Sequence, residues 1–259
     1  MRVIGLNTPL IKPGDDIPSM ILKASEQVGG LKDGDILVLA SSAVAMAQGR
    51  LRKLASIRPS KRANLIARRS SLSPEFVEIV LREADQVLGT SKSSVLTIKD
   101  GRLCTNAGID SSNAPPGQVV LMPTKPNRTA MDILQALKQN LNARLGVIIA
   151  DSAVQPLRLG TIGQAVGVAG IEPAVDCRGQ LDLFGKPLLI TFRAIADQLA
   201  SAAQVAMGEG DERVPVAVMR GASAIFTEKA KTSTKIAANR CIYMDSLKLA
   251  KILGRKKAK

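Results

Sequence analysis

The chain has 259 residues, a formal net charge of +14 and no histidine. This length supports one large domain or two small ones and is sufficient for a substantial hydrophobic core. No stretch of the sequence reaches the ~18 uninterrupted apolar residues that a membrane-spanning helix needs. Without histidine, Ser-His-Asp and Cys-His catalytic arrangements are excluded, and any metal ion must be bound by oxygen or cysteine ligands.

The cysteines and the charge narrow the class of protein further. Cys104, Cys177 and Cys241 are widely spaced and form no CxxC pair, so they predict neither a disulfide framework nor a zinc knuckle. Reduced thiols, and an N-terminus without the blocks of a signal peptide, lead us to expect a cytoplasmic protein. The positive charge attracts polyanions, including nucleotides, polycarboxylates and nucleic acid. Aromatic residues make up only 2% of the chain, which weakens the nucleic-acid interpretation because single strands stack on aromatic side chains.

Short apolar runs alternate with amphipathic stretches, which is typical of an α/β or α+β fold with mixed sheets flanked by helices. In chain order, strands are predicted at residues 36–39, 95–99, 119–122, 147–150, 188–192 and 216–219. No internal repeat or low-complexity linker marks a domain boundary. We therefore treat residues 1–245 as one catalytic region and residues 246–259 as a basic C-terminal tail.

Three helices are predicted from apolar periodicity. The clearest begins after Ser73 as N-cap, with Pro74 at its first position, and its apolar face runs to Leu88 before Gly89 ends it. The other two helices are predicted at residues 130–145 and 194–207.

Two aspartates stand just after predicted strands. Asp110 lies in the segment 106–113, and Asp151 ends the apolar run 146–150. Acidic side chains at strand ends can converge on a ligand or on a hard cation such as Mg²⁺ or Mn²⁺. The alternative is that each aspartate simply caps a strand end or a turn.

Two further segments could bind phosphate. Ser41 and Ser42 follow a predicted strand, where hydroxyls and backbone amides can hold phosphate or, more ordinarily, cap a helix. In the loop after residue 206, Gly208 and Gly210 permit positive φ, so exposed amides could hold phosphate oxygens while Glu209 reaches a phosphate-bound metal. A glycine C-cap followed by a polar turn is the alternative for that loop.

Taken together, these segments resemble the coenzyme F420-0:L-glutamate ligases, the γ-glutamyl ligases of deazaflavin coenzyme maturation. The resemblance runs from residue 9 to residue 221, and its most specific part is the segment 106–113. It is supported by residues 146–152, 182–185 and 207–210 in the order typical of the family. The resemblance implies a two-lobed α/β protein, usually an intertwined homodimer.

The resemblance also implies GTP, Mg²⁺ or Mn²⁺ with K⁺ as a further candidate ion, L-glutamate and an F420-like acceptor. In such ligases the γ-phosphate activates a carboxylate, and the amine of L-glutamate attacks the acyl phosphate. Carried over by position, the metal ligands are Asp110, Asp151, Ser152 and Glu209. The GTP-binding residues are Pro9, Leu10, Ile11, Ser41, Ser42, Asn113, Met207, Gly208, Glu209, Gly210 and Asp211. The catalytic residues are Asp110, Asp151 and Arg158.

The chain departs from the family at two charged positions. Met46 stands where the family typically has a lysine, and Gln155 where it tends to have an arginine, which leaves Arg158. Arg50 or Arg158 could supply the missing positive charge. Three hypotheses follow: a GTP-dependent γ-glutamyl ligase for coenzyme F420-0 or a related acceptor, a paralogue that binds nucleotide or cofactor without ligation, and a basic nucleic-acid-binding protein.

Overall fold

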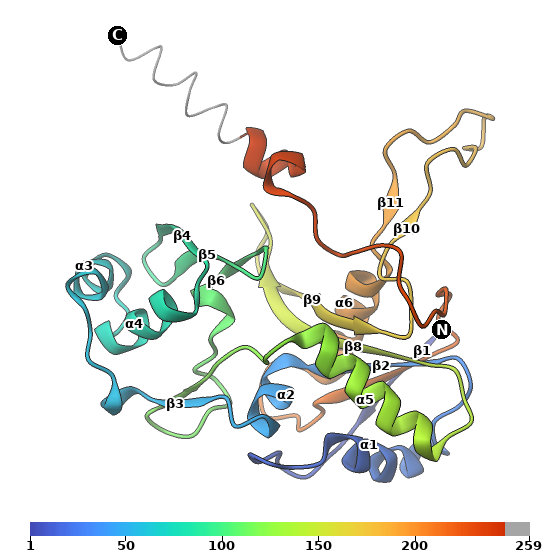
Figure 1. Cartoon of the computed structure of the whole chain (residues 1–259), viewed down its shortest axis with the longest axis horizontal. Helices are drawn as coiled ribbons and strands as arrows, with labels where there is room; N and C mark the ends of the chain where they lie inside the picture. Colours follow the sequence, from blue (N-terminus) through green and yellow to red (C-terminus); the bar gives the residue numbers. More distant parts are fainter. Residues whose placement is uncertain (247–259) are drawn as a thin grey trace.

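The computed structural model describes residues 1–246. At its centre lies a mixed five-stranded sheet in the order β1-β12-β2-β8-β9 (Figure 1). Its strands are β1 (Arg2–Leu6), β2 (Asp35–Ala40), β8 (Leu145–Val154), β9 (Thr161–Ala169) and β12 (Val216–Arg220). β2 and β8 run parallel, whereas the other neighbouring strands are antiparallel. Both parallel strands therefore end at the same edge of the sheet.

Strand β2 is apolar from Ile36 to Ala40, and this explains why helices cover both faces of the central sheet. Leu37 and Leu39 belong to one hydrophobic core, whereas Ile36 and Val38 belong to a second core on the opposite face. Successive side chains of a strand point to opposite faces, so one apolar strand contributes to two cores. The covering helices are α1 (Ile17–Ser25), α2 (Ser41–Ala47) and α5 (Pro126–Asn140) at the first core and α6 (Ile195–Met207) at the second.

Smaller sheets surround the central one. A three-stranded antiparallel sheet contains β4 (Gln86–Thr90), β5 (Val95–Lys99) and β6 (Arg102–Thr105). Helices α3 (Lys61–Ser70) and α4 (Pro74–Glu83) lie beside it, and Phe76 and Val80 share a core with Val95 (Figure 1). The remaining elements are the pairs β3 (Leu51–Lys53) with β7 (Gln118–Val120) and β10 (Val175–Asp176) with β11 (Phe192–Arg193), and 3₁₀ turns at Glu26–Val28, Leu54–Ser56, Asn106–Gly108 and Ala238–Arg240.

The predicted mixed α/β class is confirmed, while the two-lobed shape and the intertwined homodimer stay predictions. Strands predicted at 36–39, 95–99, 147–150 and 216–219 are confirmed as β2, β5, β8 and β12. These four segments are apolar runs, three of them buried in the central sheet. Such runs are readable from sequence because a strand buried on both faces is continuously apolar.

Two predicted strands are misplaced. The strand expected at 119–122 is β7, which ends at Val120. The strand expected at 188–192 is wrong except for Phe192, because the segment between β10 and β11 is an exposed arm with few ladder hydrogen bonds. Its leucines and isoleucine were apolar without being buried in a sheet.

The predicted helix boundaries need correction at three ends. Ser73 is the N-cap of α4, since Phe76 N donates a hydrogen bond to Ser73 Oγ over 3.2 Å. The helix stops at Glu83, however, and Val87 and Leu88 belong to β4, which pairs with β5. The helix expected at 130–145 is α5, which begins earlier at Pro126, a residue suited to a first helical position, and ends at Asn140, before β8 begins at Leu145. The helix expected at 194–207 is confirmed as α6.

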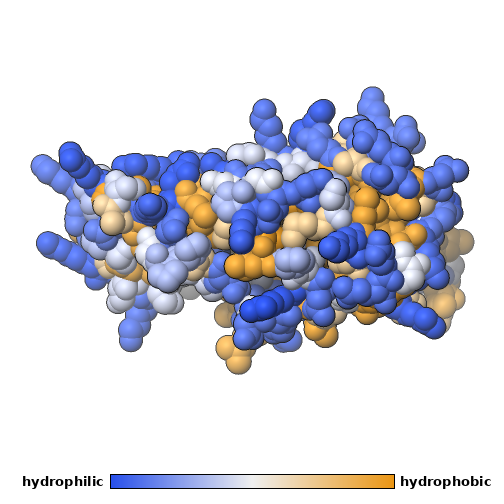
Figure 2. All heavy atoms as spheres, turned by 90° about the horizontal axis from the view of Figure 1, so that it is seen from below, coloured by the Kyte–Doolittle hydropathy of each residue, from blue (hydrophilic) through white to orange (hydrophobic). Residues whose placement is uncertain are grey.

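The surface is mainly hydrophilic. Seen from below, charged and polar side chains cover most of the face, with apolar groups visible between them (Figure 2), as is ordinary for protein surfaces. Within residues 1–246, no helix combines the length and the apolar character required to cross a membrane. The predicted basic tail, residues 246–259, lies outside the described residues except for its first residue.

Candidate active site

A pocket of ≈ 1990 Å³ lies beside the ends of β2 and β8. Single drug-sized ligands occupy roughly 300–1,000 Å³, so this pocket has room for more than one substrate. The predicted site residues that line it are Pro9, Leu10, Ile11, Ser41, Ser42, Asp110, Asn113, Asp151, Ser152, Met207, Gly208, Glu209, Gly210 and Asp211. Met46 and Gln155 line it as well. Arg158 is exposed and lies outside the lining formed by residues 1–246.

One wall of the pocket, which we name the sheet wall, consists of Ser41, Asp151, Ser152 and Glu209. Ala40 of β2 lies beside Ala150 of β8 in the parallel register. The residues that follow them, Ser41 and Asp151, are therefore neighbours as well. Ser41 Oγ accordingly donates a hydrogen bond to Asp151 Oδ1 over 2.7 Å. A break in the β8–β9 register between Ile149 and Ala150 coincides with this position. Such bulges are frequent next to active sites because they re-aim side chains.

Asp151 lies half-buried in the sheet wall. Burial raises the pKa of its carboxyl group, the hydrogen bond from Ser41 and the charge of Arg102 oppose this rise, and the nearby Asp110 carboxylate adds to it. The backbone amide of Ser152 also opposes the rise in pKa. A desolvated carboxylate is well suited to bind a cation.

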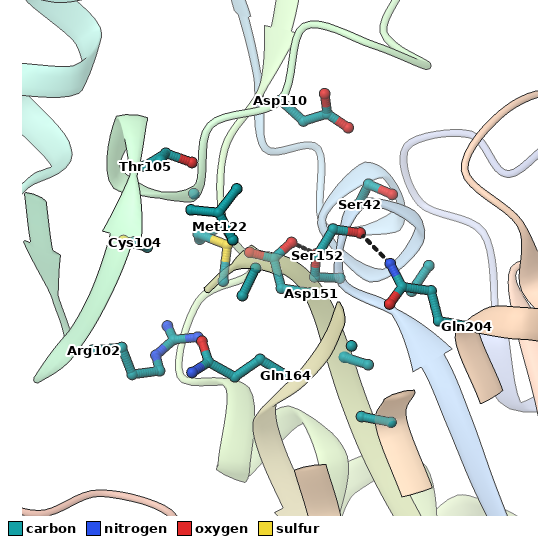
Figure 3. Close-up of a pocket in the computed structure, with 18 of the residues that line it drawn as sticks. Ser42, Arg102, Cys104, Thr105, Asp110, Met122, Asp151, Ser152, Gln164 and Gln204 are labelled. Atoms are coloured by element: carbon teal, nitrogen blue, oxygen red, sulfur yellow. Dashed lines mark hydrogen bonds between the residues drawn. The ribbon is translucent and has the colours of Figure 1, made fainter. Parts of the chain in front are cut away.

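Glu209 is held differently on the same wall. Ser152 Oγ lies 2.9 Å and 3.0 Å from its two carboxylate oxygens, and Thr161 Oγ1 donates to Glu209 Oε1 over 3.0 Å. Gln204, on α6, donates to Ser152 Oγ over 2.8 Å and also contacts Glu209 (Figure 3). Sequence reasoning did not identify Gln204, which lies one helical turn before the glycine loop. The cluster fixes Glu209 in place but occupies its oxygens.

The opposite wall, which we name the hairpin wall, consists of Arg102, Cys104, Asp110 and Asn113. Figure 3 shows Arg102 and Cys104 on one side of the pocket, Ser152 and Gln204 on the other, and Asp151 between them. Burial raises the pKa of the Cys104 thiol, which therefore stays protonated near neutral pH. Arg102 was not identified from the sequence, although it lies on one face of a strand that leads directly into the segment 106–113.

A left-handed turn at Asn106–Gly108 positions Asp110. Asn106 and Ala107 adopt φ values of 52° and 55°, which non-glycine residues rarely do. The conformation is fixed by two hydrogen bonds, from Val95 N to Asn106 Oδ1 over 2.8 Å and from Ala107 N to Thr97 Oγ1 over 2.9 Å. Strained backbone that is held this firmly is typical of functional sites.

Gly108 brings the two aspartate segments into contact. A Cβ atom at this position would overlap the side chain of Met122 and would lie 3.6 Å from Asp151 Oδ2. Its φ of 69° also favours glycine. The segment that carries Asp110 and the strand that carries Asp151 therefore lie close together at Gly108, while the convergence of the two carboxylates on one cation stays a prediction.

The residues present suit a divalent cation held by few protein ligands. Within residues 1–246, no three cysteine, aspartate and glutamate side chains gather closely enough to hold a metal ion by themselves. Mg²⁺, however, is usually bound through one or two carboxylates together with substrate phosphates. Asp110 accepts hydrogen bonds at Oδ1 from Ser112 N and Ser112 Oγ, at 2.8 Å and 2.5 Å, so Asp110 retains an oxygen for a cation. The predicted third carboxylate, Glu209, is already occupied by hydrogen bonds.

The glycine loop after α6 departs from its expected role in one respect. Gly208 has a positive φ of 74°, as predicted, whereas Gly210 does not adopt positive φ. The carboxylate of Glu212 accepts a hydrogen bond from Gly210 N over 2.8 Å. Backbone amides of this loop hold the pKa of Glu212 below its usual range. These amides therefore serve an internal anion, and Glu212 must move if phosphate is to replace it.

Neither of the two arginines proposed from the sequence to supply positive charge lines the described part of the pocket. Arg50 donates from Nε to Met122 O and from Nη2 to Glu83, both over 3.1 Å, and does not line the pocket. Arg158 is the last residue of a turn that is closed by a hydrogen bond from Arg158 N to Gln155 O over 3.2 Å. Among residues 1–246, the cations in the lining are Lys99, Arg102 and Arg213.

Comparisons with known proteins agree with this geometry. The family model described as F420-0:Gamma-glutamyl ligase matches residues 5–221. The coenzyme F420:L-glutamate ligase of Methanopyrus kandleri is 39% identical over 212 residues, which cover 82% of this chain and 82% of that relative. The protein of the same name from Methanothermobacter thermautotrophicus is 40% identical over 215 residues, covering 82% and 85%. That from Methanocaldococcus jannaschii is 38% identical over 227 residues, covering 87% and 90%.

The family match includes both walls of the pocket and both aspartate segments, and the relatives align over most of their own length. This chain belongs to the F420-0:Gamma-glutamyl ligase family.

Proposed function

We propose that this protein is a GTP- and divalent-metal-dependent ligase that adds L-glutamate in γ-linkage to coenzyme F420-0 or a related acceptor. The observation that carries the proposal is the pair Asp110 and Asp151, coupled across one pocket in a chain of this family. Relatives at 38–40% identity bear the name coenzyme F420:L-glutamate ligase. The pocket volume of ≈ 1990 Å³ is large enough for a nucleotide and an acceptor together.

In this proposal Asp110 and Asp151 hold Mg²⁺ or Mn²⁺, and Ser41 orients Asp151 through its hydrogen bond. When bound, the divalent ion neutralises charge on the phosphates during phosphoryl transfer. Ser152 and Glu209 remain predicted ligands that would have to release part of their hydrogen-bonded cluster. A K⁺ ion stays a further prediction of the family resemblance.

The nucleotide is proposed to lie along the rim of the pocket. This rim is formed by Pro9, Leu10 and Ile11, by Ser42 and Asn113, and by the loop from Met207 to Asp211. Ser41 and Ser42 begin α2, which has only seven residues, so its N-terminal amides add to phosphate binding without forming a site by themselves. Movement of Glu212 frees the amides of the glycine loop for phosphate oxygens.

The proposed reaction has two steps. An acceptor carboxylate oxygen attacks the γ-phosphorus of GTP, so that GDP leaves and an acyl phosphate forms. The amine nitrogen of L-glutamate then attacks the acyl carbon, inorganic phosphate leaves, and the nitrogen loses a proton. Both steps need positive charge beside transferring oxyanions and exclusion of water from the acyl phosphate.

The decisive experiment incubates the protein with GTP, Mn²⁺ or Mg²⁺, L-glutamate and coenzyme F420-0. We expect GDP release that depends on all components and a product heavier by one glutamyl residue in mass spectrometry. Reactions that lack metal or glutamate, and the Asp151→Asn variant, serve as controls. GDP release without glutamylated product would contradict ligation.

A second candidate function is supported by Met46. This methionine lines the pocket at the position where the family has a lysine, and it cannot supply positive charge to phosphates. The alternative is a protein that binds nucleotide or cofactor without ligating glutamate. Tight GTP binding together with failure to form product from several pterin, folate and deazaflavin acceptors would favour it.

Homodimerisation through the arm, defined as residues 175–193, is also part of the proposal. The arm extends away from the remainder of the molecule (Figure 1). Leu183, Phe184 and Ile190 on this arm are 98%, 86% and 86% exposed. An isolated two-stranded hairpin is marginally stable, and clustered apolar exposure marks interaction surfaces. A second copy of the chain is the partner implied by the family resemblance.

Light scattering tests the dimer directly. We expect a dimer at micromolar concentration and a shift toward monomer in the double variant Leu183→Ser, Phe184→Ser. Lys186→Ser, on the same arm, is the matched control because it removes an exposed side chain that is not apolar. A stable monomer of the unchanged protein would refute dimerisation without affecting the proposed reaction.

A further inference from the structure

Arg102, the first residue of β6, is a buried cation with unused hydrogen-bonding capacity. Its side chain is only 8% exposed, and within residues 1–246 its Nε atom is buried without a hydrogen-bond partner. The ion pair recorded for it in this part of the chain is a loose one, 3.7 Å from Nη2 to Oδ2 of Asp100, whose side chain is 44% exposed. Buried polar groups are almost always hydrogen-bonded, because an unpaired charged donor is costly. Arg102 therefore lacks an expected partner.

The position of the side chain indicates where that partner would lie. Arg102 lines the pocket, and Figure 3 shows its guanidinium directed toward the interior, on the side where Gln164 and Asp151 are drawn. Burial raises the pKa of the Asp151 carboxyl group and of the Cys104 thiol, and the positive charge of Arg102 offsets part of each rise. The unpaired donor thus faces the part of the pocket next to Asp151.

The other cations of the described lining are less available or less buried. Lys99 Nζ lies 3.9 Å from Glu83 Oε2, an acid that Arg50 also contacts. Arg213 is exposed at the rim. Met46 and Gln155, which also line the pocket, carry no charge. Arg102 is the buried cation of the lining within residues 1–246.

We propose that Arg102 binds an anionic oxygen group of a substrate, a carboxylate or a phosphate, next to Asp151. This inference rests on the proposed ligase function and assigns the site a substrate-binding residue on the hairpin wall. A guanidinium presents parallel N–H donors that match two oxygens of a carboxylate or phosphate, and the free Nε is one member of that fork. GTP, L-glutamate and the acidic acceptor each carry such a group.

The substitution that tests this is Arg102→Gln, compared with Arg102→Lys, Asp100→Asn and Arg62→Gln. KM is measured separately for GTP, for L-glutamate and for coenzyme F420-0, and folding is checked by thermal melting. We expect Arg102→Gln to raise one KM by roughly 10- to 100-fold, the range of a charge-assisted hydrogen bond. Arg102→Lys, which keeps the charge but loses the fork, should give a smaller rise in the same KM. If Arg102→Gln does not fold, the KM values of Arg102→Lys are used for the test instead.

Two control variants separate substrate binding from a structural role. Asp100→Asn removes the loose ion pair but leaves the guanidinium in place, and asparagine tolerates the positive φ of 50° at this position. Arg62→Gln removes one positive charge from an exposed site on α3. Substrate binding by Arg102 requires that both controls keep all three KM values. An Asp100→Asn variant that reproduces the defect of Arg102→Gln would overturn the proposal.

The pattern of KM values identifies the group that Arg102 binds. A rise for GTP assigns a phosphate, a rise for L-glutamate assigns its carboxylate, and a rise for coenzyme F420-0 assigns an acidic group of the acceptor. Three unchanged KM values in a folded Arg102→Gln variant overturn the proposal, even if kcat falls. If the unchanged protein forms no product, the ligase function fails instead. GTP and coenzyme F420-0 are then titrated alone, and equal affinities for unchanged protein and Arg102→Gln overturn the role of Arg102.

Discussion

The two walls of the pocket hold their charged side chains in different ways. On the sheet wall, Asp151 receives a hydrogen bond from Ser41, and Glu209 receives hydrogen bonds from several side chains. On the hairpin wall, Asp110 has only the local donors of Ser112, and Arg102 has an unpartnered Nε within residues 1–246.

This difference follows from how each wall is built. The sheet wall is formed where β2 ends beside β8 in parallel register, so that the neighbouring side chains of Ser41 and Asp151 meet. In the hairpin wall, Arg102 and Cys104 lie on β6, which a two-residue turn joins to β5, and Asp110 and Asn113 lie in the segment that follows β6. Groups that a protein satisfies internally are positioned, while groups left unsatisfied are available for ligand atoms. We infer that the sheet wall fixes Asp151 and Glu209 in place, whereas Arg102 on the hairpin wall is available to bind substrate.

The largest effect is expected from Asp151→Asn, which removes one of the two carboxylates of the sheet wall. Metal-dependent GTP binding should weaken by at least ~100-fold, because even the partners of metal ligands are worth 10- to 100-fold. Titration calorimetry with GTP and Mn²⁺ measures this effect. The ligand-free variant should be no less stable in thermal melting, since burial disfavours the charged form of this carboxylate.

Glu209→Gln sharpens the same test on the same wall. Its carboxylate is exposed and hydrogen-bonded by Ser152 and Thr161, and glutamine keeps an acceptor for one of them. We expect a smaller loss of GTP binding than for Asp151→Asn. Equal losses in the two variants would mean that Glu209 holds the metal as directly as Asp151 does.

The sequence predicted the sheet wall better than the hairpin wall for a physical reason. Ser41 directly follows the buried strand β2, and Asp151 lies within β8, just after its buried apolar residues; such apolar runs can be read without a structure. The role of Arg102 depends on the packing of β6 beside β8, two strands far apart in the chain. The role of Glu212 likewise depends on the folded loop, in which its carboxylate accepts a hydrogen bond from Gly210 N. Arg158, in contrast, was predicted to be catalytic from its position in the motif alone, and it lies outside the described lining.

The end of helix α4 also could not be predicted from the local sequence pattern. Val87 and Leu88 continue the apolar face of α4 in sequence, yet they pair with β5. A few apolar residues after a helix fit a helical face and a short strand equally well. The pairing with β5 decides between them, and it is not visible in the local pattern.

An intermediate effect is expected from Ser41→Ala. The variant removes the donor to Asp151 Oδ1 while leaving the carboxylate in place. Turnover should fall by about 10-fold, the lower end of the range for partners of metal ligands. Because the Ser41 hydrogen bond lowers the pKa of Asp151, its loss raises that pKa further. The acid limb of the pH–rate profile should therefore move to higher pH, and an unmoved limb would contradict the role of Ser41.

Met46→Lys tests whether positive charge is limiting beside the sheet wall. Met46 lines the pocket from α2, so a lysine there could approach the phosphates of GTP. We expect GTP binding to strengthen by about 1–3 kcal/mol if a charge-assisted hydrogen bond forms. Arg158→Ala, alone and in combination, completes a double-mutant cycle measured by GTP titration. The exposed position of Arg158 predicts near-additive effects, and strong coupling would bring that arginine back into the site.

The smallest effect is expected behind the sheet wall, at Asp197 on α6. Asp197 Oδ1 accepts a hydrogen bond from Ala165 N over 2.8 Å, and Asp197 does not line the pocket. Burial raises the pKa of this carboxyl group, and the donation from Ala165 opposes the rise. A raised pKa means that the folded state binds the proton more tightly than the unfolded state. The stability it contributes is complete below the unfolded pKa of about 3.9 and is lost as pH rises through the folded value.

Asp197→Asn should remove that pH-dependent loss, because asparagine cannot ionise and keeps an acceptor for Ala165 N. Thermal melting should give a higher Tm than the unchanged protein near neutral pH, with the difference shrinking toward about pH 4. A difference that stays constant with pH would contradict the assignment to this carboxylate. GTP binding should not change. Burial raises the pKa of both Asp151 and Asp197. If Asp197→Asn raises the Tm and leaves GTP binding unchanged, of these two aspartates only Asp151 contributes to GTP binding.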